Sequence, residues 1–457
     1  MGKRVYLQSF GCQMNAYDVA RMLEVLSRDG YAVTDQPDDA DLLLVNTCAI
    51  REKAEAKTGS AVGRLRPYKQ RRPGAVIAVG GCVATLQGKD LLEQLPDVDL
   101  TFGPDAIPAL PDLVRQVRSD GARLAAVDFI DVEDYRFLDA DPRPDSGRVT
   151  ALVTIQKGCD NDCAYCVVPA TRGREVSRPA AEVVAEVVRF VEAGAREVTL
   201  IGQNVNSYRH GSSDFPALLR QVAAVAGLYR LRFTTSHPKD FHEPVADCFR
   251  DLHTLCEWLH LPVQSGSTRV LHRMQRTYRR EEYLRKIEYL RGVCPDISLS
   301  TDIIVGYPGE SDVEFEETLS LLEEVQYDSI YSFKYSPRPG TPAAGLGDSI
   351  AEPVKSVRLA RVQDLQKAIT AGRLHRFVGR VEEVLVEGES RQGGQACGRT
   401  RANVVVNFVP PPAQTPLSLR GRLVQVPIAA ARTHTLWGGT SLPESAPRRG
   451  GLALPVV

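Results

Sequence analysis

The first part of the chain alternates between short apolar runs and longer amphipathic stretches. Apolar runs at residues 5–10, 42–45 and 76–79 each end in a polar or glycine-containing segment, and a helical pattern over residues 17–29 separates the first two. Strands that alternate with helices in units of about 30 residues are typical of a parallel sheet with crossover helices. The pattern therefore predicts a doubly wound α/β sheet domain over residues 1–132.

Residues 149–372 continue the alternation, with helical stretches such as 180–193 and 280–293 between β-rich runs. The pattern predicts six β/α units that form a partial parallel barrel, in which ligands bind at the C-terminal ends of the strands. The polar segments that end the expected strands lie at 202–204, 236–238, 264–267, 306–310 and 336–340. Glycine and proline also simply end strands, so either interpretation remains open for any one segment.

Residues 373–440 change to short alternating strands punctuated by glycine and proline, which predicts a small all-β barrel. Residues 133–148, in which aspartate and proline dominate, are interpreted as a linker between the first two domains. Residues 441–457 have no periodicity, and we predict a disordered tail there.

The composition is that of an ordinary globular protein, with 43% hydrophobic and 25% charged residues and a net charge of -1. No stretch approaches the ~18 consecutive apolar residues of a membrane span. The apolar run after Lys3 and Arg4 is too short for a signal peptide. We therefore expect a cytoplasmic protein with no membrane partner, in which patterned cysteines serve as metal ligands or catalytic groups rather than in disulfides.

Three cysteines stand in one tight loop directly after an expected strand. Three residues separate Cys159 from Cys163, and two separate Cys163 from Cys166. Three thiolates in a loop can hold three irons of a cubane cluster and leave the fourth iron open to a ligand. Zinc is the alternative, but a structural zinc site takes four ligands. His210 or His237 would have to complete it, and neither has a tight spacing to the loop.

This loop, with Tyr165 before its last cysteine, resembles that of the radical S-adenosylmethionine superfamily. The resemblance implies that the open iron binds the methionine moiety of S-adenosylmethionine. It places Gly202 and Gln203 where the superfamily has a Gly-Gly-Glu element for the methionine amino group, so the usual acid is missing here. It also implies cofactor contacts for Ser236 and for Glu310, which ends a stretch similar to the adenosine-contacting strand.

Three more cysteines, Cys12, Cys48 and Cys82, each follow one of the N-terminal apolar runs, 36 and 34 residues apart. The ends of adjacent parallel strands lie about 4.8 Å apart, so these cysteines are expected to converge. We predict a second three-cysteine cluster there, against the alternative of three independent buried thiols. The remaining cysteines share no spacing pattern and are interpreted as small buried hydrophobes: Cys248, Cys256, Cys294 and Cys397.

The two cysteine sets together resemble the tRNA branch of the methylthiotransferase family of radical S-adenosylmethionine enzymes, the MiaB type. Besides the central loop, the resemblance rests on Gly11-Cys12-Gln13-Met14-Asn15, on residues 46–54 (Asn-Thr-Cys-Ala-Ile-Arg-Glu-Lys-Ala), on Gly80-Gly81-Cys82-Val83-Ala84 and on Thr234-Thr235-Ser236-His237-Pro238. It covers roughly residues 3–438.

The resemblance implies two [4Fe-4S] clusters, S-adenosylmethionine as co-substrate, and tRNA as substrate. The expected reaction gives N(6)-dimethylallyladenosine at position 37 its 2-methylthio group, through hydrogen abstraction by a 5′-deoxyadenosyl radical, sulfur insertion and methyl transfer. No side chain is assigned as catalytic. An electron-donating reductase and a sulfur donor protein are the expected partners, and we expect a monomer.

The C-terminal barrel is basic in a way that the net charge conceals. Between residues 390 and 440 there are six arginines and neither lysine nor an acidic residue: Arg391, Arg399, Arg401, Arg420, Arg422 and Arg432. An arginine surface is typical of phosphate-backbone binding, although a merely solvated basic face is the alternative. The module resembles the TRAM domain, an RNA-binding barrel. Two further basic runs either extend the RNA surface or are solvated loops: Arg66, Lys69, Arg71 and Arg72, and Arg172, Arg174 and Arg178.

Two other functions remain open at this point. An electron-transfer protein with two clusters and an RNA-binding tail would need fully ligated clusters, and neither set offers a fourth cysteine at a suitable spacing. The same chemistry on threonylcarbamoyladenosine tRNA or on a ribosomal protein is the nearer alternative. An acidic barrel would favour the protein substrate, whereas this barrel is basic.

Overall fold

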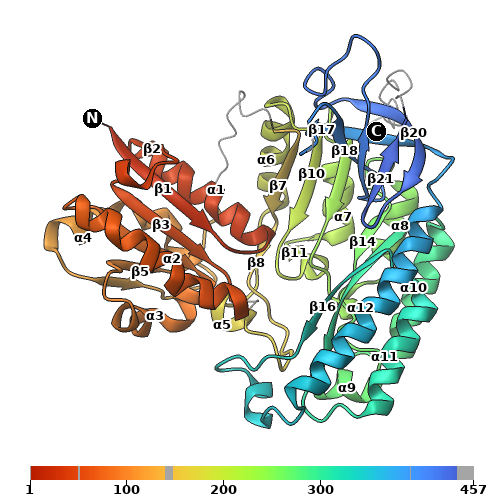
Figure 1. The fold of residues 1–457 in the computed structure, drawn as a ribbon, viewed down its shortest axis with the longest axis horizontal. Coiled ribbons are helices and arrows are strands. Elements are labelled where there is room, and N and C mark those ends of the chain that lie inside the picture. Colours follow the sequence, from red (N-terminus) through yellow and green to blue (C-terminus); the bar gives the residue numbers. More distant parts are fainter. Residues whose placement is uncertain (1, 50–51, 139–147, 392, 440–457) are drawn as a thin grey trace.

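The computed structural model describes residues 2–49, 52–138, 148–391 and 393–439, which form three domains in chain order (Figure 1). The predicted tail at 441–457 lies outside the described residues, as do residues 139–147 of the predicted linker. None of the helices in the described ranges combines the length and the apolar character needed to cross a membrane.

The N-terminal domain is a six-stranded sheet in which every pairing is parallel, in the order β2-β1-β3-β4-β5-β6. The strands are β1 (Lys3–Ser9), β2 (Tyr31–Val33), β3 (Leu42–Thr47), β4 (Val76–Gly81), β5 (Leu100–Phe102) and β6 (Leu124–Ala126). The helices are α1 (Gln13–Arg28), α2 (Glu52–Arg71), α3 (Cys82–Gln94) and α4 (Leu110–Asp120).

Successive residues of the central strands enter two separate cores. Leu42 and Leu44 pack with residues of α1 and α4 on one face of the sheet, whereas Leu43 and Val45 pack with residues of α2 and α3 on the other. All four leucine and valine side chains are fully buried. Burial on both faces explains why the sequence shows a continuous apolar run here instead of an alternating one. The predicted doubly wound sheet is confirmed.

The central domain holds six parallel strands in two sheets of three, ordered β13-β10-β7 and β14-β15-β16. A parallel bridge between Leu231 and Leu255 continues the first sheet towards the second. The strands are β7 (Thr150–Thr154), β10 (Glu197–Ile201), β13 (Arg230–Phe233), β14 (Trp258–His260), β15 (Ser298–Val305) and β16 (Ser329–Lys334). The prediction of a partial barrel of six β/α units is confirmed.

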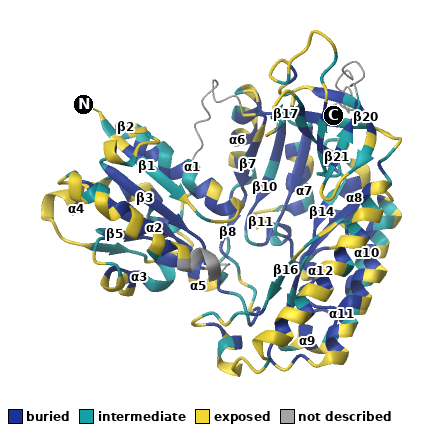
Figure 2. Ribbon diagram, in the orientation of Figure 1, coloured by how far each residue is buried: buried dark blue, intermediate teal, exposed yellow. Residues whose placement is uncertain are grey.

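Helices cover the outside of this partial barrel (Figure 1). They are α6 (Ala180–Glu192), α7 (Phe215–Ala223), α8 (Glu243–Asp251), α9 (Thr268–Arg273), α10 (Arg280–Val293), α11 (Asp312–Val325) and α12 (Glu352–His375). Figure 2 shows the strands largely in the buried colour and the outward helix faces exposed. A short helix, α5 (Val168–Arg172), and a two-strand ribbon of β8 (Gln156–Lys157) and β9 (Val176–Ser177) lie towards the N-terminal domain.

The C-terminal domain is a closed barrel in the order β17-β18-β19-β21-β20, which confirms the predicted small all-β fold. Its strands are β17 (Val381–Glu389), β18 (Ala396–Thr400), β19 (Val405–Phe408), β20 (Leu423–Ala431) and β21 (Thr435–Gly438). Two buried arginines of β13 attach it to the central domain. Arg230 donates to the carbonyl of Arg399 at 2.6 Å, and Arg232 to that of Thr400 at 2.9 Å.

The chain is tightly packed at Gly81, directly before Cys82. The φ of Gly81 is +93°, and a β-carbon there would lie 2.4 Å from the carbonyl oxygen of Thr47. Gly30 has a similar φ of +85° but open space around it. We expect Gly30→Ala to cost about 1–2 kcal/mol of unfolding free energy, and Gly81→Ala to cost clearly more. Urea denaturation of both variants measures this, and equal losses would contradict the close approach.

Candidate functional site

The central cysteine loop runs from β8 to the start of α5. The backbone turns at Gly158, where φ is +75° and a β-carbon would collide with the carbonyl of Arg174. The amide of Cys159 then donates to the carbonyl of Gly173 at 3.2 Å, and the amide of Cys166 to that of Cys163 at 2.9 Å. The loop is thereby held in one conformation at the C-terminal end of the β7 segment.

Each thiol of this loop has a polar neighbour, which for Cys166 is the backbone amide of Val168 at 3.5 Å. The amide nitrogen of Asn161 lies 3.3 Å from the sulfur of Cys159. The sulfur of Cys163 accepts from the buried guanidinium of Arg276 at 3.3 Å and lies 3.8 Å from Nε2 of His237. Arg276 also donates to the carbonyl of Pro262 at 2.7 Å, so its position beside the loop is fixed.

The electrostatics of the loop suit thiolates held by a cation. Burial raises the pKa of Cys166 to about 12, and the neighbouring thiols of Cys163 and Cys159 add to the rise. Burial likewise raises the pKa of Cys159. Thiolates in such a place are stabilised by bound iron, whose positive charge reverses the local preference. Burial and the charge of Arg276 lower the pKa of His237 to about 2, which leaves its imidazole neutral.

Gly202 and Gln203, predicted to contact the cofactor, lie beside this loop at the end of β10. The side-chain oxygen of Gln203 accepts from the amide of Gly158. A β-carbon on Gly202 would lie 3.2 Å from the side chain of Gln156. Buried polar atoms without a partner gather at these strand ends, namely Nε2 of Gln203, Oε1 of Gln156 and Oγ of Ser236. Unpaired buried groups of this kind fit a polar ligand such as S-adenosylmethionine.

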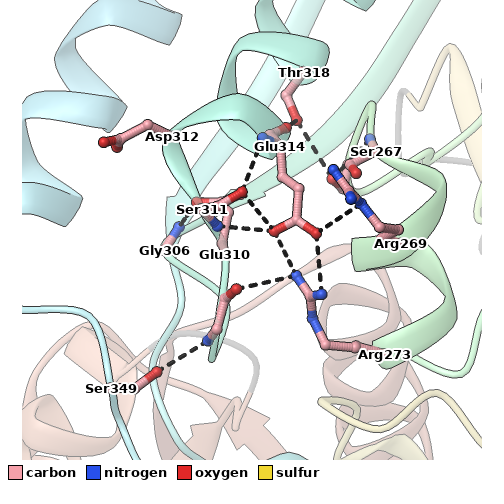
Figure 3. Close-up of polar contacts among 12 residues, drawn as sticks. Ser267, Arg269, Arg273, Gly306, Glu310, Ser311, Asp312, Glu314, Thr318 and Ser349 are labelled. Carbon is pink, nitrogen blue, oxygen red and sulfur yellow. Dashed lines mark hydrogen bonds and ion pairs between the residues drawn. The ribbon is translucent and has the colours of Figure 1, made fainter.

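Glu310, the fourth predicted contact, is buried and already has partners. One of its oxygens accepts from Arg358 at 2.8 Å and from the amide of Gly306 at 2.7 Å, so it closes the turn after β15. The other oxygen, Oε1, has no partner. Figure 3 shows this turn beside the neighbouring cluster of Ser311, Glu314 and Arg273. A role of Glu310 towards a cofactor stays a prediction.

The three N-terminal cysteines lie at the ends of neighbouring strands. Cys12 caps α1 after β1, Cys48 follows β3, and Cys82 begins α3 after β4. β3 lies between the other two strands, and Thr47 pairs with Gly81, which brings Cys48 and Cys82 to the same level. Cys48 and Cys82 are buried, whereas Cys12 is exposed.

A buried asparagine links the first two cysteines of this set. The side chain of Asn15 donates to the carbonyl of Thr47 at 2.7 Å, and its oxygen lies 3.2 Å from the sulfur of Cys12. A hydrogen bond with Cys48 lowers the pKa of Cys12 to about 6, and the backbone of Asn15 and the charge of Arg172 add to this effect. A set of three cysteines in which one thiol ionises readily and two are buried is a suitable set of ligands for iron.

No group of three His, Cys, Asp or Glu side chains in the described ranges is gathered about one point in the way a single metal ion requires. A cubane cluster is held from its corners, with one thiolate to each iron, so its ligands need not meet at one point.

Two of the three arginines in the second basic run of the sequence are buried in ion pairs, whereas Arg174 is exposed. Arg172 forms a bidentate pair with Asp18 of α1, with N–O distances of 3.1 and 2.6 Å, and both side chains are about 95% buried, being 6% and 5% exposed. Arg178 is fully buried and pairs with Glu186. The interpretation of these two arginines as RNA contacts is therefore wrong.

The arginines of the C-terminal barrel divide into two groups. Arg401 forms a bidentate pair with Glu257 of the central domain, at 2.6 and 2.8 Å, and Arg399 pairs with Glu387 at 3.1 Å. These two are fixed within the protein, so the barrel does not present all six arginines as one surface. The remaining four are exposed: Arg391, Arg420, Arg422 and Arg432.

Two functional neighbours carried no signal in the sequence. Arg276 contacts the sulfur of Cys163 but lies 113 residues away, and Asp18 pairs with Arg172 across 154 residues. Asn15 stands within a segment quoted for the family resemblance, although its role as a hydrogen-bond bridge appears only in the structure. His237, considered as a zinc ligand, lies at the central loop, whereas His210 is exposed on β11 (Arg209–His210).

Comparison with known families assigns each domain to a class. Residues 4–103 match the model described as uncharacterized protein family UPF0004, residues 153–322 match the radical SAM superfamily, and residues 375–438 match the TRAM domain. The middle part of the chain is thus a radical S-adenosylmethionine domain, a class that uses S-adenosylmethionine and [4Fe-4S] clusters.

Curated relatives match over nearly the whole chain. Proteins named tRNA-2-methylthio-N(6)-dimethylallyladenosine synthase are 48% identical in Syntrophotalea carbinolica, over 95% of this chain and 99% of the relative, and 48% identical in Geobacter metallireducens, over 95% and 98%. The one from Anaeromyxobacter sp. strain Fw109-5 is 49% identical, over 96% and 94%. The chain belongs to this family of synthases.

Solved structures support the fold. The radical S-adenosylmethionine methyltransferase TsrM from Kitasatospora setae, with cobalamin and a [4Fe-4S] cluster bound, is 15% identical with a TM-score of 0.55, over 75% of this chain and 74% of that one. The cobalamin-dependent radical enzyme OxsB is 11% identical with a TM-score of 0.53, over 80% of this chain and 56% of that one.

The Glu314 cluster of Figure 3 gives a pH-dependent prediction. Burial raises the pKa of Glu314, but hydrogen bonds from Arg273, at 2.8 Å, and Ser311 outweigh it and lower the pKa to about 2. Because this folded-state pKa lies below the unfolded value, the carboxylate stabilises the fold at neutral pH, and that contribution is lost as the pH falls from about 4.5 towards 2.

Glu314→Gln should therefore lower the unfolding free energy by about 2 kcal/mol at pH 7, and the difference from the parent should shrink below pH 4.5. Glu316→Gln is the matched control, since Glu316 lies on the same helix as Glu314, α11, and forms an exposed pair with Arg361 of α12. Its replacement should change stability by less than about 1 kcal/mol. Denaturant titrations at several pH values measure both. A loss at Glu314 that does not depend on pH would contradict the assignment.

Proposed function

We propose that this chain converts N(6)-dimethylallyladenosine at position 37 of tRNA to its 2-methylthio derivative. The observation that carries the proposal is the presence of two separate three-cysteine sets, one in the central loop and one at neighbouring strand ends of the N-terminal sheet. Full-length relatives that bear the name of this activity support the assignment of substrate.

The ligands of the two [4Fe-4S] clusters are, on this proposal, the two cysteine sets. Cys159, Cys163 and Cys166 hold the radical-forming cluster, and Cys12, Cys48 and Cys82 hold the auxiliary cluster. Each set supplies three thiolates and leaves one iron open, as a cluster must if it is to bind a ligand. The placement of the first set in one short loop, and of the second at the ends of three adjacent parallel strands, supports both assignments.

The chemistry explains why cofactors are needed. Carbon 2 of the adenine carries a hydrogen that no side-chain base can remove and no leaving group that can depart. When bound, S-adenosylmethionine and the clusters supply the radical, the sulfur and the methyl group. The side chains bind and orient these groups. Gln203 accepts a hydrogen bond from the amide of Gly158 and so fixes the cysteine loop, and Oγ of Ser236 and Oε1 of Gln156 have no protein partner and can bind a polar ligand.

The tRNA contacts lie, on this proposal, on the C-terminal barrel. Arg391, Arg420 and Arg432 are exposed, and the guanidinium of Arg432 lies 5.4 Å from the ring centre of Trp437. Arginine and an aromatic ring together suit RNA phosphates and unstacked bases. We further propose a cytoplasmic monomer that receives electrons from a separate reductase and sulfur from a donor protein.

The iron content tests the two ligand sets. Anaerobically reconstituted protein should hold about eight irons, and each triple variant, Cys159/Cys163/Cys166→Ala or Cys12/Cys48/Cys82→Ala, should hold about four. Cys397→Ser is the matched control, because Cys397 lies in the C-terminal barrel and its replacement should leave about eight irons. Four irons in the parent protein would remove the auxiliary cluster from the proposal.

Mass spectrometry of tRNA nucleosides tests the substrate. Deletion of the gene should abolish the 2-methylthio group. N(6)-dimethylallyladenosine without that group should then accumulate in the tRNA. The parent gene and Cys397→Ser should restore the 2-methylthio group, whereas neither triple cysteine variant should. Loss of the methylthio group from threonylcarbamoyladenosine instead would establish the alternative tRNA substrate. Unchanged tRNA would exclude both.

A further inference from the structure

A buried arginine of the central domain lies at the cysteines of the N-terminal domain. Arg172 ends α5, six residues after Cys166. Its side chain is 6% exposed. Besides its ion pair with Asp18, the guanidinium interacts electrostatically with the thiols of Cys82 and Cys12. A cation supplied by one domain therefore stands at the proposed cluster ligands of the other.

Packing fixes both partners of this ion pair. Val167, at the start of the segment that carries Arg172, packs against Cys82 and Ala49. Asp18 lies on α1, whose first turn begins at Cys12. Each charge thus stands on a helix whose first residues lie at or against a proposed cluster ligand.

We propose that Arg172 is a positioning residue that sets the electrostatic environment of the auxiliary cluster and raises its reduction potential. The proposal rests on the proposed function, since it requires a cluster at Cys12, Cys48 and Cys82. One-electron reduction adds a negative charge to a cluster, and a cation in a water-poor site stabilises that charge. Asp18 acts in the opposite sense, because its carboxylate offsets part of the positive charge of Arg172.

Because Arg172 and Asp18 carry opposite charges, an electrostatic role of the pair can be distinguished from a purely structural one. Both residues belong to the same ion pair between the two domains, so a structural role predicts that replacing either one has the same kind of effect. An electrostatic role predicts effects of opposite sign. Removing the cation should make the cluster harder to reduce, and removing the carboxylate should make it easier.

The experiment uses the Cys159/Cys163/Cys166→Ala protein, in which the auxiliary cluster is the remaining one. Its one-electron midpoint potential is measured by an anaerobic redox titration followed by electron paramagnetic resonance, together with the iron content of each variant. Arg172→Gln should shift the potential to more negative values, and Asp18→Asn to more positive values. Arg172→Lys keeps the charge and should stay nearer the parent than Arg172→Gln.

Arg174→Gln is the matched control. Arg174 lies two residues further on, but it is exposed and pairs with Asp160 at 2.7 Å, so its replacement should leave the potential unchanged. If Arg172→Gln fails to fold or loses its iron, the midpoint potential of Asp18→Asn tests the proposal alone. A shift of that potential to more positive values supports the proposal, and an unchanged potential overturns it.

Two outcomes overturn the proposal in distinguishable ways. Potentials of Arg172→Gln and Asp18→Asn that both stay at the parent value, or that move in the same direction, assign the pair a structural role and leave the proposed function intact. Absence of iron from the starting triple variant removes the auxiliary cluster itself, and the proposed function falls with it.

Discussion

The interface between the N-terminal sheet and the central cysteine loop depends on two ion pairs withdrawn from water. Arg172 pairs with Asp18, and Lys157 pairs with Asp105, all four side chains being less than 10% exposed. Desolvating four charges costs much of what their attraction returns, so such pairs contribute little net stability while an unpaired member is strongly unfavourable. They therefore penalise every other alignment of the two domains and hold the two cysteine sets in one relative position.

The parts of the fold that follow from local periodicity could be predicted from the sequence. The run at 42–45 and the glycine-rich end before Cys82 were sufficient to predict parallel strands and to place cysteines at their ends. The order of strands β1, β3 and β4 then brings Cys12, Cys48 and Cys82 to one edge. Here the sequence pattern and the tertiary structure agree, because strand period and crossover length are local properties of the chain.

The partners of charged residues could not be predicted in the same way. Arg172, Arg178 and Arg401 look alike as members of basic runs, but their carboxylate partners lie 154, 8 and 144 residues away. Charge spacing along a chain indicates an exposed surface only when no acidic group from another element covers it. The charge pattern therefore predicted the net charge of each segment correctly but the wrong environment for these three arginines.

A buried arginine lies beside the thiols of both cysteine sets, and in both cases the arginine belongs to the central domain. Arg276 donates to Cys163 in the central cysteine loop, and Arg172 stands by Cys12 and Cys82. Clusters held by three thiolates carry negative charge, which a low-dielectric site disfavours unless a fixed cation lies near. Because both guanidiniums are buried and fixed by hydrogen bonds, the central domain completes the electrostatic environment of the N-terminal cysteines as well as its own. The N-terminal sheet thus provides the thiols of Cys12, Cys48 and Cys82 but not the positive charge beside them.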